Sequence, residues 1–188
     1  MKQEIFGDHI EIQGLNYPIN TGKEGCYKII IERTVEQLLA MSSYHSKILV
    51  NMFVLQCQGD ERYNDKISRL MRKITKHIRR TKNGGKMAYL WVREMNPDRS
   101  THYHLAIFVN GNTFKSIWRF YLIIRRHWKE NWDNGAVHYI SRTYRITRDD
   151  WDETCKAVYH LSYLAKTRTK GCYPYLVNEY CTSRLKAK

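Results

Sequence analysis

The sequence predicts an α+β fold: an antiparallel sheet with a ferredoxin-like or RRM-like βαββαβ core, followed by a C-terminal helix. Two hydrophobic patterns support this. Some segments are apolar continuously or at every second residue, as strands are, and others are apolar at every third or fourth residue, as helices are. From residue 47 onward the order is strand, helix, strand, strand, helix, strand, helix. Such an order is typical of a split βαβ unit with helices on one face of the sheet.

Four segments are predicted to be strands. Residues 47–57 are almost continuously apolar, which suits a buried central strand. Residues 87–94 and 102–110 are joined by a seven-residue loop containing Asn-Pro-Asp, a combination that favours a turn, so they should form a hairpin. Residues 135–146 supply the last strand. In this topology the third strand, residues 102–110, lies in the middle of the sheet.

The predicted helices are amphipathic. Residues 63–82 alternate apolar and basic positions at helical spacing and end at Asn83-Gly84-Gly85, a typical C-terminal cap. Residues 113–132 repeat the pattern. Residues 32–43 form a short helix before the first strand. A final helix, capped by the segment 147–150, is expected to run to about residue 168.

We expect a single domain at residues 26–188, including a basic and irregular C-terminal tail. Residues 1–25 contain four glycines and one proline without a sustained hydrophobic period, so they are predicted to form an irregular N-terminal arm.

The charge of the chain indicates a polyanionic partner. Thirty-two Lys and Arg residues against 18 acidic residues give a net charge of +14 and a pI near 9.6. Such a charge attracts nucleic acid, an anionic membrane surface or an acidic protein. No apolar run approaches the ~20 residues of a spanning helix, so we expect no membrane association. The five cysteines are odd in number and scattered, which fits a reducing cytoplasm.

Three residues of the predicted hairpin form a candidate metal site. His102 and His104 are two apart on one strand, so both imidazoles point to the same face. If Glu94 pairs with His102, its carboxylate lies on that face beside them. Two imidazoles and a carboxylate suit a catalytic divalent ion, and a phosphate substrate would favour Mg²⁺ or Mn²⁺. The alternative is that the two histidines merely lie on a half-buried sheet.

The last predicted helix carries a candidate nucleophile. Tyr159, Tyr163 and Lys166 share one helix face because they are four and three residues apart. A free tyrosine has a pKa of ~10, and a nearby metal and lysine would stabilise the phenolate needed for attack. The alternative is ordinary amphipathic packing with a solvated lysine.

Taken together, these motifs resemble those of HUH endonucleases, a superfamily that includes rolling-circle replication initiators and relaxases. The order His-x-His on a central strand, then Tyr-x-x-x-Tyr-x-x-Lys on a later helix, is typical of that superfamily. The segments 89–94 (YLWVRE), 102–106 (HYHLA) and 161–166 (LSYLAK) are most similar to the prophage family labelled YagK/YfjJ, which includes filamentous-phage (inovirus-type) replication proteins. Tyr103 departs from the pattern, because its position is usually aliphatic.

The resemblance implies metal-dependent nicking and joining of single-stranded DNA at a replication origin, through a 5′-phosphotyrosine link that leaves a free 3′-OH. His102 and His104 would bind the metal, Tyr163 would be the main nucleophile, Lys166 its helper and Tyr159 a second nucleophile. The protein would act in the cytoplasm of a bacterial host on a phage, prophage or plasmid. The sequence has no Walker motif, so a helicase would come from the host or another chain.

Basic and aromatic residues near these motifs are candidates for holding the strand, because cations follow phosphates and rings stack on bases. They are Arg93, Arg99, Arg142, Tyr144, Arg145, Arg168 and Lys170.

Other functions remain open at this stage. The main alternative is a non-catalytic RRM-like nucleic-acid-binding module, which would keep the charge and the aromatic residues without needing converging catalytic groups. An iron oxygenase with a 2-His-1-carboxylate site would use the same ligands, but would leave the basic charge unexplained. A prophage protein whose active site has decayed would bind DNA without any need for a divalent ion.

Overall fold

Four strands of the main sheet lie in the order β10 (Tyr180–Thr182), β6 (Met87–Met95), β7 (Thr101–Asn110) and β5 (Lys47–Gln56). Beyond β5, two short strands, β8 (Ala136–Tyr139) and β9 (Tyr144–Thr147), pair with opposite ends of β5. A computed structural model describes residues 3–57, 63–96, 100–130, 135–168, 170 and 177–188. All pairings in this sheet are antiparallel, and β7 lies in its middle. The predicted α+β class and the central position of the third strand are confirmed.

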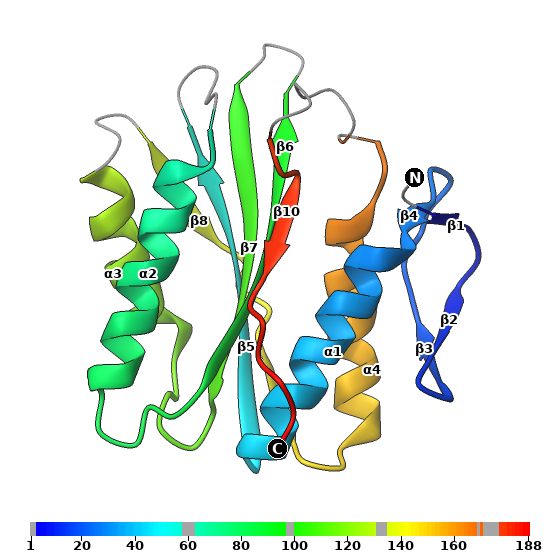
Figure 1. Ribbon diagram of the computed structural model, residues 1–188, viewed down its shortest axis with the longest axis horizontal. Helices are drawn as coiled ribbons and strands as arrows, with labels where there is room; N and C mark the ends of the chain where they lie inside the picture. Colours follow the sequence, from blue (N-terminus) through cyan, green and yellow to red (C-terminus); the bar gives the residue numbers. More distant parts are fainter. Residues whose placement is uncertain (1–2, 58–62, 97–99, 131–134, 169, 171–176) are drawn as a thin grey trace.

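Helices cover both faces of the sheet (Figure 1). One face packs against α2 (Asp65–Arg80) and α3 (Ile117–Lys129), and the other against α1 (Lys28–Tyr44) and α4 (Trp151–Ser162). The two helices of the predicted βαββαβ core, α2 and α3, share one face as expected, whereas α1 and α4, which lie outside that core, cover the other face. The reason is visible in β7, where residues 105–109 are all buried and contribute alternately to the two hydrophobic cores, so neither face can be left to solvent.

The N-terminal arm is not irregular, contrary to the prediction. The segment forms β1 (Glu4–Ile5), β2 (His9–Ile12) and β3 (Leu15–Pro18), and β1 pairs with β4 (Cys26–Tyr27). Gln13 and Gly14 both have positive φ, 54° and 76°, as the two central residues of a tight hairpin turn require. Gly14, one of the glycines on which the irregular arm was predicted, therefore forms the turn between β2 and β3. The hairpin packs on α4, where the Tyr17 ring lies 4.9 Å from that of Trp151.

Three other boundaries differ from the prediction. The expected strand 135–146 divides into β8 and β9, and between them the backbone N–H of Ile140 donates to Met52. The tail, expected to be irregular, contributes β10 to the sheet edge, where it pairs with β6. Helix α4 ends at Ser162 and continues only as the 3₁₀ turn η1 (Tyr163–Ala165), because Lys166 then forms a β-bridge with Cys26. None of the described helices is long and apolar enough to cross a membrane.

We predict that Trp128→Ala lowers the free energy of unfolding by about 3–5 kcal/mol, the usual cost of deleting a buried aromatic side chain. Trp128 is fully buried on α3, and its indole N–H donates to the backbone oxygen of Gln56 at 3.0 Å, which joins the helix to β5. Urea denaturation would measure the change. Trp118→Ala is the matched control on the same helix. That side chain is 52% exposed, and its loss should cost about 1 kcal/mol or less. Equal losses for the two variants would contradict the described packing.

Candidate metal centre and active-site groove

Glu94 on β6 and the two histidines on β7 converge on one face of the sheet. The hairpin register pairs Glu94 with His102 and Val92 with His104, which is the register assumed for the candidate metal site. One carboxylate oxygen of Glu94, Oε2, lies 3.3 Å from Nε2 of His102 and 3.3 Å from Nε2 of His104. One ligand atom from each residue can be chosen so that all lie within 4.8 Å of one another. The three residues could therefore hold one metal ion.

The donor atoms and the burial of this cluster suit a divalent cation. Two imidazole nitrogens and one carboxylate oxygen leave further coordination positions for substrate or water. The His102 and His104 side chains are each 14% exposed, and that of Glu94 is 9% exposed. Burial by itself would raise the pKa of Glu94. Hydrogen bonds from His102 and His104, together with the charge of Lys170, outweigh burial and hold this pKa well below its ordinary value.

Lys170 holds the second carboxylate oxygen of Glu94. Its side chain is fully buried, and its ammonium lies 2.9 Å from Oε1 of Glu94 and donates to the backbone oxygen of Lys166. Oε2 therefore remains for the imidazoles. Lys170 was predicted to contact DNA, and its burial contradicts that role. A lysine next to a basic tail resembles a solvated cation in the sequence, so only the fold reveals this ion pair.

Tyr163 faces the metal cluster from the end of α4. It begins the 3₁₀ turn η1, is 44% exposed, and its ring centroid lies 6.4 Å from that of His104. The Lys166 ammonium lies 4.5 Å from the centroid of the Tyr163 ring, a cation–π distance. Tyr163 and Lys166 therefore contact each other, although the regular helix ends before both.

A groove of about 700 Å³ joins Tyr159 to this arrangement. Tyr159 is 47% exposed on the last turns of α4. The groove is lined by His104, Tyr159 and Tyr163, with Arg142 among the other residues of its wall. One metal-facing imidazole and both predicted nucleophiles thus share one open space, with a cation at its edge.

The N-terminal residues fix the end of α4 from outside, a role that sequence reasoning missed. The backbone N–H of Asn20 donates to the Ser162 hydroxyl at 2.8 Å, and that of Thr167 donates to the Gly25 oxygen at 3.3 Å. These bonds lie on either side of Tyr163. No motif in residues 1–25 signals such contacts, because they join segments that lie far apart in the sequence.

The other predicted DNA-binding residues are dispersed. Arg142 lines the groove and lies 5.5 Å from the ring centroid of Tyr144. Tyr144 itself is 2% exposed, and its hydroxyl is 3.0 Å from Nδ1 of His160, so its ring is not free to stack on a base. Arg145 donates to the backbone oxygens of residues 111 and 115. Its partner on β5, residue 49, is seven residues from Gln56 at the metal end, about 23 Å at roughly 3.3 Å per residue.

Arg93 and Arg168 also differ from the expectation. The Arg93 side chain is 1% exposed and points to the other face of the sheet, where it donates to Asn64 and Thr101. A buried guanidinium with protein acceptors cannot follow a phosphate chain, so Arg93 is excluded from the DNA surface. Arg168 is exposed, with a carboxylate oxygen of Glu24 at 3.4 Å. Arg99 lies outside the described residues.

Comparison with known proteins identifies the family. A family model for replication-associated proteins of the ORF2 and filamentous-phage gene II type matches residues 53–170. The matched range contains the metal cluster, both tyrosines and the two lysines near them. No curated protein and no solved structure matches the chain. Since the family match covers more than half of the sequence, this protein belongs to the ORF2/gene II family of replication-associated proteins.

Proposed function

We propose that this protein is an HUH-type endonuclease that nicks and rejoins single-stranded DNA at an origin, through a 5′-phosphotyrosine intermediate, to initiate rolling-circle replication. The observation that carries the proposal is the exposed Tyr163 ring beside His104, within a family of replication-associated proteins. The two tyrosines and the metal cluster together supply the nucleophile and the metal ligands that strand transfer needs.

In the proposed reaction each of these groups has one role. The phenol oxygen of Tyr163 attacks the scissile phosphorus, a new O–P bond forms, and the bond from phosphorus to the 3′-oxygen breaks. The proton that the phenol loses is balanced by the one that the 3′-oxygen gains. Rejoining reverses these changes. A divalent ion held by Glu94, His102 and His104, either Mg²⁺ or Mn²⁺, would polarise the phosphoryl oxygen and so lower the barrier to attack.

Two further residues support this step. The ammonium of Lys166 lies over the Tyr163 ring and would stabilise the negative charge that develops on the reacting groups during attack. Tyr159, on the same groove, would accept a second strand end when replication is terminated. Arg142 at the groove wall would neutralise a neighbouring phosphate. We further propose that the protein acts in the cytoplasm of a bacterial host, with a helicase supplied by the host or the replicating element.

The non-catalytic RRM-like alternative is less well supported. RRM sheets bind RNA by stacking bases on exposed aromatic side chains. In this protein helices cover both faces of strands β5 and β7 at the centre of the sheet. Tyr103, the aromatic residue between the two histidines, is fully buried. The iron oxygenase alternative would use the same three ligands, but it gives no role to Tyr163 or to the family relationship.

We predict that Tyr163→Phe abolishes the covalent protein–DNA adduct and changes the affinity for DNA by less than about threefold, because only the nucleophilic oxygen is removed. Single-stranded oligonucleotides from the origin, incubated with Mn²⁺ or Mg²⁺, would be resolved on a denaturing gel. Tyr159→Phe is the matched control, since it also removes one hydroxyl from the groove. If Tyr159→Phe reduces adduct formation more than Tyr163→Phe does, Tyr159 is the main nucleophile and Tyr163 the second one. An adduct that survives both substitutions would contradict the proposal.

We predict that His104→Ala weakens Mn²⁺ binding by more than about 100-fold, because even the loss of an outer-shell partner costs 10–100-fold. Calorimetric titration would measure the affinity, and circular dichroism would check that the variant is folded. The matched control is His9→Ala, an exposed histidine on β2. Comparable losses of affinity in both variants would show that the ion binds elsewhere.

We predict that Lys170→Met lowers the free energy of unfolding of the metal-free protein by about 3–5 kcal/mol, because it leaves the buried Glu94 carboxylate without a counter-charge. Adding Glu94→Gln should recover a substantial part of that loss, since the uncompensated charge is then gone. Urea denaturation would measure the free energy of unfolding of Lys170→Met, Glu94→Gln and the double variant, which together form a double-mutant cycle. Additive losses would mean that the two side chains are not coupled.

A further inference from the structure

A cationic surface lies on the opposite side of the sheet from the metal cluster. Within helix α2 the only acidic residue is Asp65, at its first position, whereas basic residues occur on every turn. The apolar residues of the helix are buried in the core that α2 shares with α3, so the basic side chains extend from the surface of the molecule. They are Lys66, Arg69, Arg72, Lys73, Lys76, Arg79 and Arg80.

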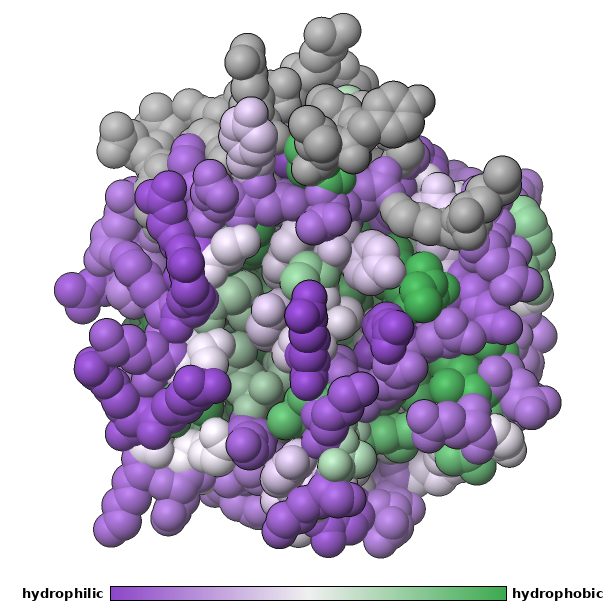
Figure 2. All heavy atoms as spheres, viewed as in Figure 1, coloured by the Kyte–Doolittle hydropathy of each residue, from purple (hydrophilic) through white to green (hydrophobic). Residues whose placement is uncertain are grey.

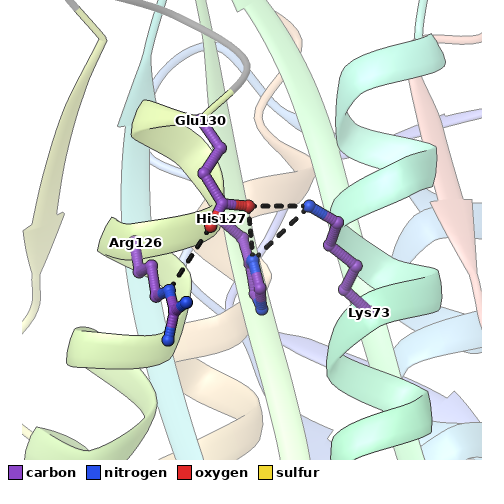
Figure 3. A network of polar contacts seen from close by, with 4 residues as sticks. All are labelled: Lys73, Arg126, His127 and Glu130. Atoms are coloured by element: carbon purple, nitrogen blue, oxygen red, sulfur yellow. Dashed lines mark hydrogen bonds and ion pairs between the residues drawn. The ribbon is translucent and has the colours of Figure 1, made fainter.

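On the side of α2 that faces α3, Lys73 has an acidic partner (Figure 3). The Lys73 ammonium lies 2.8 Å from Oε2 of Glu130. His127 of α3 contacts the same oxygen, and Arg126 contacts the other carboxylate oxygen, Oε1. Hydrogen bonds from His127 and Lys73 lower the pKa of Glu130 to about 2, so this carboxylate stays ionised. Figure 3 shows the side chains of Lys73, Arg126 and His127 gathered around the Glu130 carboxylate.

The other side of α2 has no such compensation. Between α2 and the edge formed by β6 and β10 lie two adjoining hollows of about 690 and 860 Å³, which share Thr75, Arg79 and Tyr89. Figure 2 shows this face hollowed between hydrophilic side chains, over a paler, weakly apolar floor. Six exposed cations line the two hollows, and none has an acidic partner among the described residues: Arg72, Lys76, Arg79, Arg80, Lys86 and Arg184.

The shape and the charge of this groove fit a phosphate chain better than free bases. Arg72, Lys76 and Arg79 lie at successive turns of one helix, so their charges form a row along the groove. Cations in such a row release condensed counterions when they meet DNA phosphates, which favours binding. Stacking of bases needs exposed rings, but the Trp91 side chain on the groove floor is only 3% exposed, and the two tyrosine rings that line the hollows, Tyr44 and Tyr89, are half-buried.

We propose that the groove between α2 and the β6–β10 edge, defined by Arg72, Lys76, Arg79 and Arg184, binds the sugar–phosphate backbone of a second segment of DNA. The inference rests on the proposed function for its choice of DNA as the ligand. Residues of β6 alternate between the two sites: Trp91 lines this groove, whereas Glu94 lies in the metal cluster on the opposite face. The segment bound here is therefore distinct from the strand placed against Tyr163.

The test compares two variants that each lose two positive charges. Arg72→Gln/Lys76→Gln removes two groove cations, and glutamine retains a similar helix propensity. Lys47→Gln/Lys115→Gln removes two exposed lysines that do not line either hollow. DNA affinity is measured by fluorescence anisotropy at several salt concentrations without divalent ions. Labelled duplex DNA and a labelled single strand of the same sequence form the two arms.

The plot of the logarithm of the association constant against the logarithm of salt concentration has a negative slope, and each phosphate contact contributes about 0.9 to its magnitude with duplex DNA or about 0.7 with a single strand. Because the groove variant loses two contacts, the magnitude of its slope should fall by about 1.8 with duplex DNA or by about 1.4 with a single strand. The arm that shows the reduction identifies the form of DNA bound. An unchanged slope in both arms, or an equal reduction in the Lys47/Lys115 variant, would overturn the proposal. These measurements need no cleavage, so a failure of adduct formation in the wild type would contradict the nuclease proposal while leaving this result intact.

Discussion

The pairing of β6 with β7 is the constraint on which the candidate site depends. Because Glu94 pairs with His102, the carboxylate and both imidazoles lie on one face, and Oε2 of Glu94 is equally distant from the two Nε2 atoms. A slip of one residue would move Glu94 to the opposite face, among the aromatic side chains of the other core. The register is supported from both sides, since β5 pairs along nearly the whole of β7 and β10 pairs with β6.

The two layers of helices give the sheet two separate chemical surfaces. On the α1 and α4 side the sheet presents the metal cluster, and the end of α4 brings Tyr163 to it. On the α2 and α3 side the same strands present apolar residues, and the helix outside them presents cations. An antiparallel sheet with one solvated face could not separate the functions in this way. The segment after the N-terminal hairpin completes the first surface, because Asn20 and Gly25 hydrogen-bond to Ser162 and Thr167 on either side of the turn after α4.

Much of this arrangement could be predicted from the sequence because it depends on local periodicity. Alternation along β7 predicts that His102 and His104 share a face. The pairing of Glu94 with His102 was an assumption that the seven-residue loop does not fix, and the structure has that register. The N-terminal hairpin could not be predicted, because its glycines are equally typical of a coil and its packing partners lie far along the chain. Arg93 and Lys170 were predicted to contact DNA because charge usually implies exposure. Their acceptors, Asn64 and Thr101 for one and Glu94 for the other, are brought together only by tertiary structure.

In the proposed reaction one phosphodiester meets both the metal cluster and the Tyr163 hydroxyl. Anomalous diffraction from crystals of the Tyr163→Phe variant, grown with Mn²⁺ and an uncleaved single strand, tests that claim most directly. We expect one manganese peak in coordination contact with Glu94, His102 and His104, and a phosphate bridging that ion and the ring edge at position 163. A manganese peak elsewhere, or a phosphate that contacts the ion but lies beyond reach of residue 163, would contradict the claim.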